Sequence, residues 1–248
     1  MKRASYTPYF VAATAVILIV FFEPTARRLA GGHWQRGKYV YQDSLSLDVH
    51  AVIGFTFVAA FVIQIILGRR QRAHDSARRL HEKLGKLLII LVVPLFVGTA
   101  AWVVADRSTS IAPELSVIFK VDREMGRVVL GELLVFTSFF FVRAWLAIRD
   151  GDVARHVDAV LGAFLMASAI ATIRFLYSAI WATGAGSPFS VIGMYFITVA
   201  IVVGAMALAY ARAGRFAANR RVLAGLVAVT VATGLLCMPL YDFMDTTS

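Results

Sequence analysis

Residues 84–105 read LGKLLIILVVPLFVGTAAWVVA, and no charged side chain follows Lys86 in this run. An α-helix rises about 1.5 Å per residue and a bilayer hydrocarbon core is about 30 Å thick, so roughly 20 apolar residues cross it. A run of this length is typical of a membrane-spanning helix. The stretch therefore predicts that the chain is an integral membrane protein.

Further runs of similar length and composition occur along the chain. The seven predicted spans lie near residues 6–23, 47–68, 84–105, 128–148, 157–181, 188–211 and 222–241. Glu23-Pro24 ends the first run, and the glycine-containing segment 184–188 separates the fifth from the sixth. We expect an all-α, polytopic membrane protein with seven transmembrane helices in a single domain over residues 1–248.

The composition agrees with this fold class and excludes others. Hydrophobic residues make up 59% and charged residues 16% of the chain, whereas a soluble domain carries about a quarter charged residues. The net charge of +10 comes mainly from loops between the apolar runs, so we expect no nucleic-acid partner. The one cysteine, Cys237, excludes an intrachain disulfide and an iron–sulfur cluster.

The loops also predict the orientation, because lysine and arginine accumulate on the cytoplasmic side of membrane proteins. With the N-terminus inside, 16 such residues fall in inner segments and 8 in outer ones. We therefore expect the N-terminus in the cytoplasm, the C-terminus outside, and anionic lipid at the basic cytoplasmic loops. A signal peptide is the alternative for residues 1–30, but no small-residue cleavage site follows Phe22 directly, which favours a retained first helix.

Polar side chains inside spans are costly and usually face the bundle interior, so their helical phase is informative. Two spans each carry a stripe of polar, small and aromatic residues on one face. The members are His50, Gly54, Phe57, Phe61 and Gln64 in the second span, and His81, Gly85, Leu88, Val92 and Thr99 in the third. Two interpretations stay open, because such stripes line wet sites or form packing seams between helices.

Ionisable residues also occur in the fourth and fifth spans. Glu132 and Arg143 share one side of the fourth, and Arg174 shares a face of the fifth with His156. These helices run in opposite directions, so an ion pair between Glu132 and Arg174 is predicted, with or without a chemical role. Since the first, sixth and seventh spans lack ionisable interior residues, we expect a four-helix core of the second to fifth spans with three peripheral helices.

His81 and His156 lie at the cytoplasmic ends of their spans and therefore at one depth. On diagonal, parallel helices they have the geometry to ligate the iron of haem b, with Phe136 and Phe139 walling a haem or quinone site. Against this, both lie about 20 Å from the bilayer centre, and a second histidine pair is missing. A zinc site and plain interfacial histidines beside lipid phosphate are the alternatives.

Several of these residues carry a family pattern. His50, the segment 81–86, Gly151-Asp152, His156 and Arg174 resemble the motifs of a bacterial family of predicted multi-span membrane proteins, domain of unknown function 2306. Four positions depart from it, since other residues stand where the family usually has arginine: Glu82, Lys86, Val157 and Gly162. The resemblance covers roughly residues 45–180 and implies a shared bundle in a bacterial inner membrane, but no activity.

The sequence leaves three function hypotheses open. The first is a redox protein with a haem b or quinone site at His81 and His156. The second is a transporter or proton-relay protein whose pathway is lined by His50, Glu132 and Arg174. The third is a structural subunit that binds partners in a larger membrane complex. No substrate and no catalytic residue follow from the sequence.

Overall fold

The computed structural model describes residues 6–31, 35–36, 39–40, 44–70, 74–106, 116–182 and 191–245. Its helices are Thr7–Leu29 (α1), Leu45–Arg70 (α2), Asp75–Leu87 (α3), Val93–Ala105 (α4), Ser116–Arg149 (α5), Val153–Ala182 (α6), Val191–Arg212 (α7) and Phe216–Asp245 (α8). A π-helical turn, Leu88–Val92 (η1), joins α3 to α4. Two short strands, Gln35–Arg36 (β1) and Tyr39–Val40 (β2), pair antiparallel with Gln35 opposite Val40.

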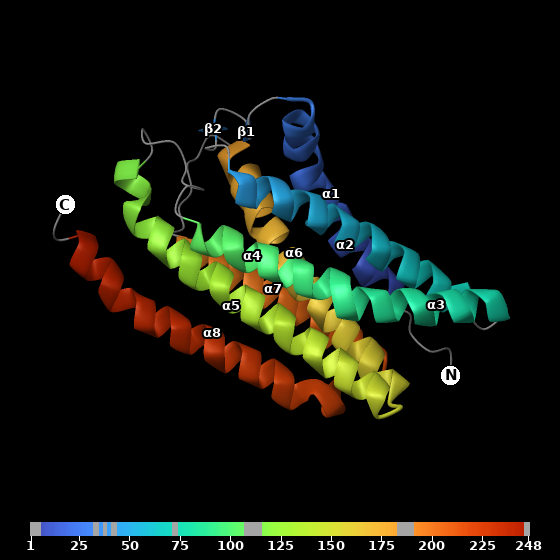
Figure 1. Cartoon of the computed structure of the whole chain (residues 1–248). Coiled ribbons are helices and arrows are strands. Elements are labelled where there is room, and N and C mark those ends of the chain that lie inside the picture. Colours follow the sequence, from blue (N-terminus) through green and yellow to red (C-terminus); the bar gives the residue numbers. More distant parts are fainter. Residues whose placement is uncertain are drawn as a thin grey trace.

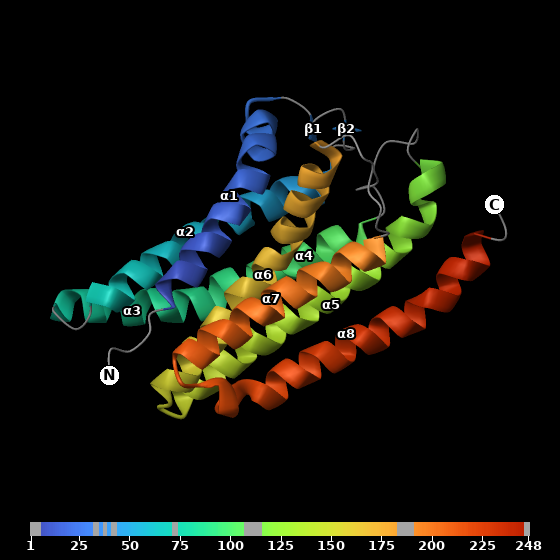
Figure 2. The same ribbon diagram turned by 180° about the vertical axis from the view of Figure 1, so that it is seen from behind.

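The helices form one elongated bundle in which successive long helices run in opposite directions (Figure 1). One end holds the start of α1, α3 and the turns after α5 and α7, while the opposite end holds the end of α8 together with β1 and β2 (Figure 2). We call the first of these the basic end, because the helices that finish there close on Arg70, Arg149 and Arg212. The alternation is the one expected from the sequence.

Two glycines shape the tight turns at the basic end. Gly151 after α5 and Gly214 after α7 have φ values of 75° and 70°, which favour glycine. The backbone N–H groups that follow them close the preceding helices, from Asp152 to the carbonyl of Ala147 at 2.9 Å and from Arg215 to that of Tyr210 at 2.7 Å. These turns place the first residues of α6 and α8 beside the ends of α5 and α7.

Among the residues that the structure describes, six helical segments are long and apolar enough to cross a membrane. They are Leu45–Arg70, Asp75–Ala105, Arg127–Arg149, Val153–Ile173, Gly193–Arg212 and Phe216–Leu236, and Thr7–Phe22 is a shorter apolar stretch in α1. A multi-pass, helical membrane architecture is thus confirmed. The helices outrun the predicted spans, and α5 begins at Ser116 rather than near residue 128.

The third predicted span is a continuous rod of α3, η1 and α4. It begins at Asp75, although the sequence predicted a start near residue 84, because the charged residues of α3 continue the helix outside the apolar run. Pro94 lies at the start of α4, just after η1, and has no N–H to donate to the carbonyl of Ile90. The wider π-turn accommodates this missing hydrogen bond, so the proline alters the helix without ending it.

The most buried helices are α6, α7 and α5. The buried share of the apolar segment is 61% in α6, 50% in α7 and 39% in α5, against 28% in α8 and 17% in both α2 and the α3–α4 rod. The prediction that the sixth span, α7, is peripheral to a core of the second to fifth spans is therefore wrong. Small residues such as Ala163 and Ala209, both fully buried, let neighbouring backbones approach, and they mark the centre better than ionisable residues do.

Candidate functional site

The two stripes predicted on the second and third spans face each other across α2 and the α3–α4 rod. His50 Nδ1 lies 3.1 Å from Thr99 Oγ1, and Gln64 Nε2 donates to the carbonyl of His81 at 2.9 Å. Between these polar contacts the rings of Phe57 and Phe96 stack with centroids 4.5 Å apart. The geometry is that of a packing seam, and aromatic rings separate His50 from the polar groups at the basic end.

The two candidate ligand histidines both lie at the basic end, His81 in α3 and His156 in the first turn of α6. The ring of His81 packs against α2, where a Cβ added at Gly68 would lie 3.3 Å from His81 Cε1. The Nδ1 atom of His81 is buried and has no hydrogen-bond partner among the described residues. His156 Nδ1 donates to the carbonyl of Ala144 at 2.9 Å.

The two phenylalanines predicted beside these histidines point elsewhere. Phe136 is 6% exposed and belongs to the hydrophobic core. Phe139 is 47% exposed and lines a pocket that neither His81 nor His156 lines. The structure therefore does not bring the four predicted residues to one place.

Glu132 of α5 contacts α8 rather than a described basic side chain. Thr230 Oγ1 donates to its Oε1 at 3.2 Å, and its Oε2 is buried with no hydrogen-bond partner among the residues that the structure describes. The side chain of Arg174 lies outside the described residues, so the Glu132–Arg174 pair stays a prediction.

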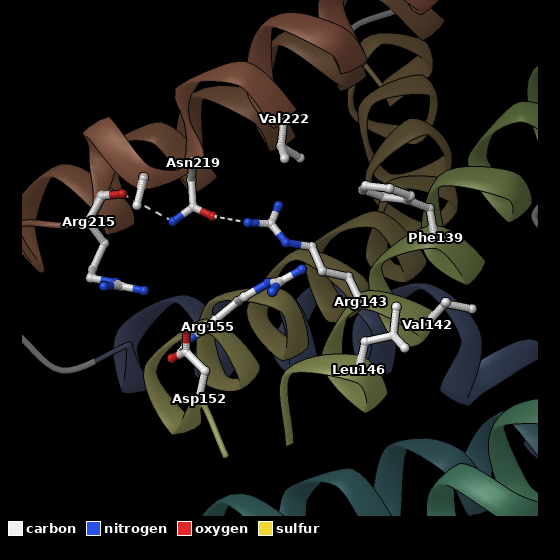
Figure 3. Close-up of a pocket in the computed structure, with 10 residues that line it drawn as sticks. Phe139, Val142, Arg143, Leu146, Asp152, Arg155, Arg215, Asn219 and Val222 are labelled. Atoms are coloured by element: carbon white, nitrogen blue, oxygen red, sulfur yellow. Dashed lines mark hydrogen bonds between the residues drawn. The ribbon is translucent and has the colours of Figure 1, made fainter. Parts of the chain in front are cut away.

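A pocket of about 620 Å³ lies at the basic end between the last turns of α5 and the first turns of α6 and α8 (Figure 3). Polar residues gather on one side of the pocket and apolar residues on the other (Figure 3). Its polar lining is Arg143, Asp152, Arg155, Arg215 and Asn219, and its apolar lining is Phe139, Val142, Leu146, Ala218 and Val222.

Arg143 has unmatched donors in this pocket. Its Nη2 donates to Oδ1 of Asn219 at 2.8 Å, across 76 positions of sequence, whereas its Nη1 is buried and has no hydrogen-bond partner among the described residues. Leaving a buried charged donor unmatched costs free energy, on the order of 1–3 kcal/mol or more. An acceptor brought by a ligand would remove this cost.

Asp158 binds both Asn219 and Arg215, and this aspartate is only 2% exposed. Asp158 Oδ2 accepts from Nδ2 of Asn219 at 2.9 Å and from Nε of Arg215 at 3.0 Å. Its Oδ1 accepts from the hydroxyl of Tyr6 at 2.6 Å, and the hydroxyl of Tyr210 donates to its backbone carbonyl at 2.9 Å. This network ties α1, α6, α7 and α8 together and orients the amide of Asn219 towards Arg143.

The pocket carries an excess of positive charge. Arg143, Arg155 and Arg215 line it, and of these only Arg215 has an ion pair in the described part of the chain, with Asp158. The start of α8 adds the positive end of a helix dipole, since Arg215 and Asn219 lie at its first turns. This arrangement is suited to bind an anion.

The sequence identified Arg143 and Phe139 but missed Asp158, Arg155, Arg215 and Asn219. An aspartate just inside an apolar run was a usable signal for Asp158. The glycine and aspartate of the family pattern have a structural role here, because Asp152 Oδ1 accepts from the backbone N–H of Arg155 at 2.9 Å and caps α6.

Comparison of the chain with protein-family models, with curated proteins and with solved structures finds no match. The resemblance to domain of unknown function 2306 therefore stays a prediction.

Proposed function

We propose that this chain is a bacterial inner-membrane protein that binds a phosphate- or carboxylate-bearing ligand at its cytoplasmic end. The main support is Arg143, which lines a pocket of about 620 Å³ and whose buried Nη1 has no hydrogen-bond partner in the described part of the chain. Arg155 and Arg215 line the same pocket, so three arginines add positive charge around one space. A guanidinium group presents its N–H donors in a fixed fork that matches the oxygens of phosphate and carboxylate.

The proposed orientation puts the basic end in the cytoplasm. Lysine and arginine accumulate on that side of membrane proteins, and arginines close α2, α5 and α7 at this end. Counting α1 as a span, with its apolar stretch Thr7–Phe22, gives seven crossings, an N-terminus inside and a C-terminus outside. Anionic lipid of the inner leaflet would then face the basic residues of α2 and α3.

The anion site is tested by thermal unfolding of the protein in a non-ionic detergent, with sodium phosphate compared with sodium chloride at equal ionic strength. Phosphate is expected to raise the unfolding midpoint, because a ligand that binds the folded state stabilises it by mass action. Arg143→Gln should abolish the rise. Arg149→Gln should keep it, since Arg149 stacks on Trp145 at 5.6 Å outside the pocket. An equal rise in both variants would exclude the site.

A redox centre at His81 and His156 is the second candidate. It is favoured by the hydrogen bond from His156 Nδ1 to a backbone carbonyl, which leaves Nε2 free to ligate a metal. Phe136 and Phe139 do not enclose a ligand there, so a haem or quinone would need other walls. An oxidised-minus-reduced absorption spectrum tests this candidate, and a haem Soret band lost in both His81→Ala and His156→Ala would support it.

A further inference from the structure

The pocket between α5 and α8 has two chemically different halves. On α5, Phe139 precedes Arg143 by four residues, which places it about 6 Å farther from the helix end at Arg149. On α8, Val222 follows Asn219 by three residues, about 4.5 Å farther from the helix start. Both helix termini lie at the basic end, so Phe139 and Val222 lie deeper in the bundle than Arg143 and Asn219, whereas Leu146 and Ala218 lie closer to the basic end than these two polar residues.

The apolar half is an open surface rather than packed core. Phe139 is 47% and Val142 55% exposed, whereas Phe140 and Ala144 of the same helix are 0% and 2% exposed. Phe139, Val142 and Leu146 follow each other at helical spacing and form one face of α5 along the pocket. An inorganic anion bound at Arg143 would leave this face uncovered, whereas a hydrocarbon chain would cover it and gain from its burial.

Resting on the proposed anion site, we infer that the ligand is an anionic amphiphile of the phospholipid class. Its phosphate binds Arg143, and Arg155 and Arg215 add positive charge around the headgroup. Its acyl chain lies on Phe139 and Val142, between α5 and α8 (Figure 3). This order of charge and hydrocarbon is the order within a bilayer leaflet, and basic pockets between membrane helices are suited to such headgroups.

Two probes separate the amphiphile from the bare anion. Dihexanoyl phosphatidic acid carries a phosphate and short acyl chains, and glycerol 3-phosphate carries the phosphate alone. Both are titrated calorimetrically into the full chain in a non-ionic detergent. Two pairs of variants accompany the wild type. Arg143→Gln is matched by Arg149→Gln, and Val142→Gln is matched by Val135→Gln, which alters a residue that is 65% exposed on the same helix but does not line the pocket.

The expected result is that the acyl chains tighten binding to the wild type at least tenfold over glycerol 3-phosphate. Val142→Gln should remove most of this advantage and leave glycerol 3-phosphate binding unchanged, while Arg143→Gln should weaken both probes at least tenfold. The two control variants should behave as the wild type does.

Two other outcomes overturn the inference in distinguishable ways. If both probes bind with equal affinity through Arg143 and Val142→Gln changes neither, the anion site stands and the amphiphile is excluded. If Arg143→Gln changes neither probe, or if neither probe binds, the amphiphile and the proposed anion site fail together.

Discussion

At the scale of single residues, Asp158 and Arg143 show how a buried charge is matched or left unmatched. Asp158 accepts hydrogen bonds from Tyr6, Arg215 and Asn219, whereas Arg143 uses one nitrogen on Asn219 and keeps Nη1 without a partner among the described residues. Asn219 hydrogen-bonds to both side chains, so the carboxylate of Asp158 orients the amide that accepts the hydrogen bond from Arg143. The Asp158 network therefore fixes the positions of Asn219 and Arg215 on the polar side of the pocket.

Asp158→Asn is expected to lower the free energy of unfolding by about 3 kcal/mol, because hydrogen bonds to a charged group contribute about 1.5–3 kcal/mol each and several are weakened. Thermal or denaturant unfolding in detergent measures the change. Asp150→Asn is the control, since Asp150 is 47% exposed and lies 3.4 Å from Arg149. Exposed pairs contribute little, so the control should change stability by less than about 0.5 kcal/mol. Equal losses in the two variants would contradict the role of Asp158.

The residues of the pocket were only partly predictable from the sequence. The phase of Arg143 and Phe139 on one helix could be read from their spacing, because helical periodicity is local. The partner of Arg143 lies 76 positions away on another helix, and that pairing depends on how α5 and α8 pack. The same reason explains why Phe136 and Phe139, close in sequence, lie in the core and in the pocket respectively.

At the scale of elements, close contact between α5 and α6 depends on a glycine. A Cβ added at Gly162 of α6 would overlap the ring of Phe140 on α5, which is fully buried. A larger side chain at this position would not fit against the ring as it is placed here. The α5–α6 pair is the part of the bundle on which the pocket is built.

Gly162→Ala is expected to destabilise the protein by about 1–3 kcal/mol, because overpacking a filled core forces side chains or backbones to shift. Phe140→Leu in the same chain should recover part of the loss. Gly131→Ala on α5 is the matched control, since nothing lies within 4 Å of the added Cβ, and alanine favours helix by up to about 1 kcal/mol. Unfolding midpoints of the four proteins test this, and a neutral Gly162→Ala would contradict the close contact.

The apolar runs predicted which segments are long and apolar enough to cross a membrane, because length and hydropathy are properties of each segment alone. They did not predict where helices end, since α3 continues beyond its apolar run and α5 begins before its own. They also gave the wrong centre of the bundle. Small residues of α6 and α7 let other helices pack closely around these two. Which helices pack there is not visible in the sequence, because the contacts join segments that are far apart along the chain.

At the scale of the whole molecule, successive helices alternate in direction. The turns that contain Gly151 and Gly214 therefore lie at one end, and Ala30, which follows α1, lies at the other. The pocket opens at the first of these ends. The proposed orientation therefore makes the ligand site a cytoplasmic one, facing the inner leaflet.

Labelling of single cysteines in intact cells tests this orientation. In a Cys237→Ser background, Ala30→Cys should react with a membrane-impermeant maleimide added outside, and Asp150→Cys should react only after permeabilisation. The positive-inside distribution of arginine is the physical reason for this expectation. The opposite labelling pattern would place the pocket outside the cytoplasm and refute the orientation.

Native mass spectrometry of the protein extracted gently from its membrane tests whether the Arg143 pocket holds an anionic ligand. We expect a bound species with the mass of an anionic lipid on the wild type and on Arg149→Gln, and its loss from Arg143→Gln. Equal occupancy of the wild type and Arg143→Gln, or a wild type that carries no anionic species, would contradict this expectation.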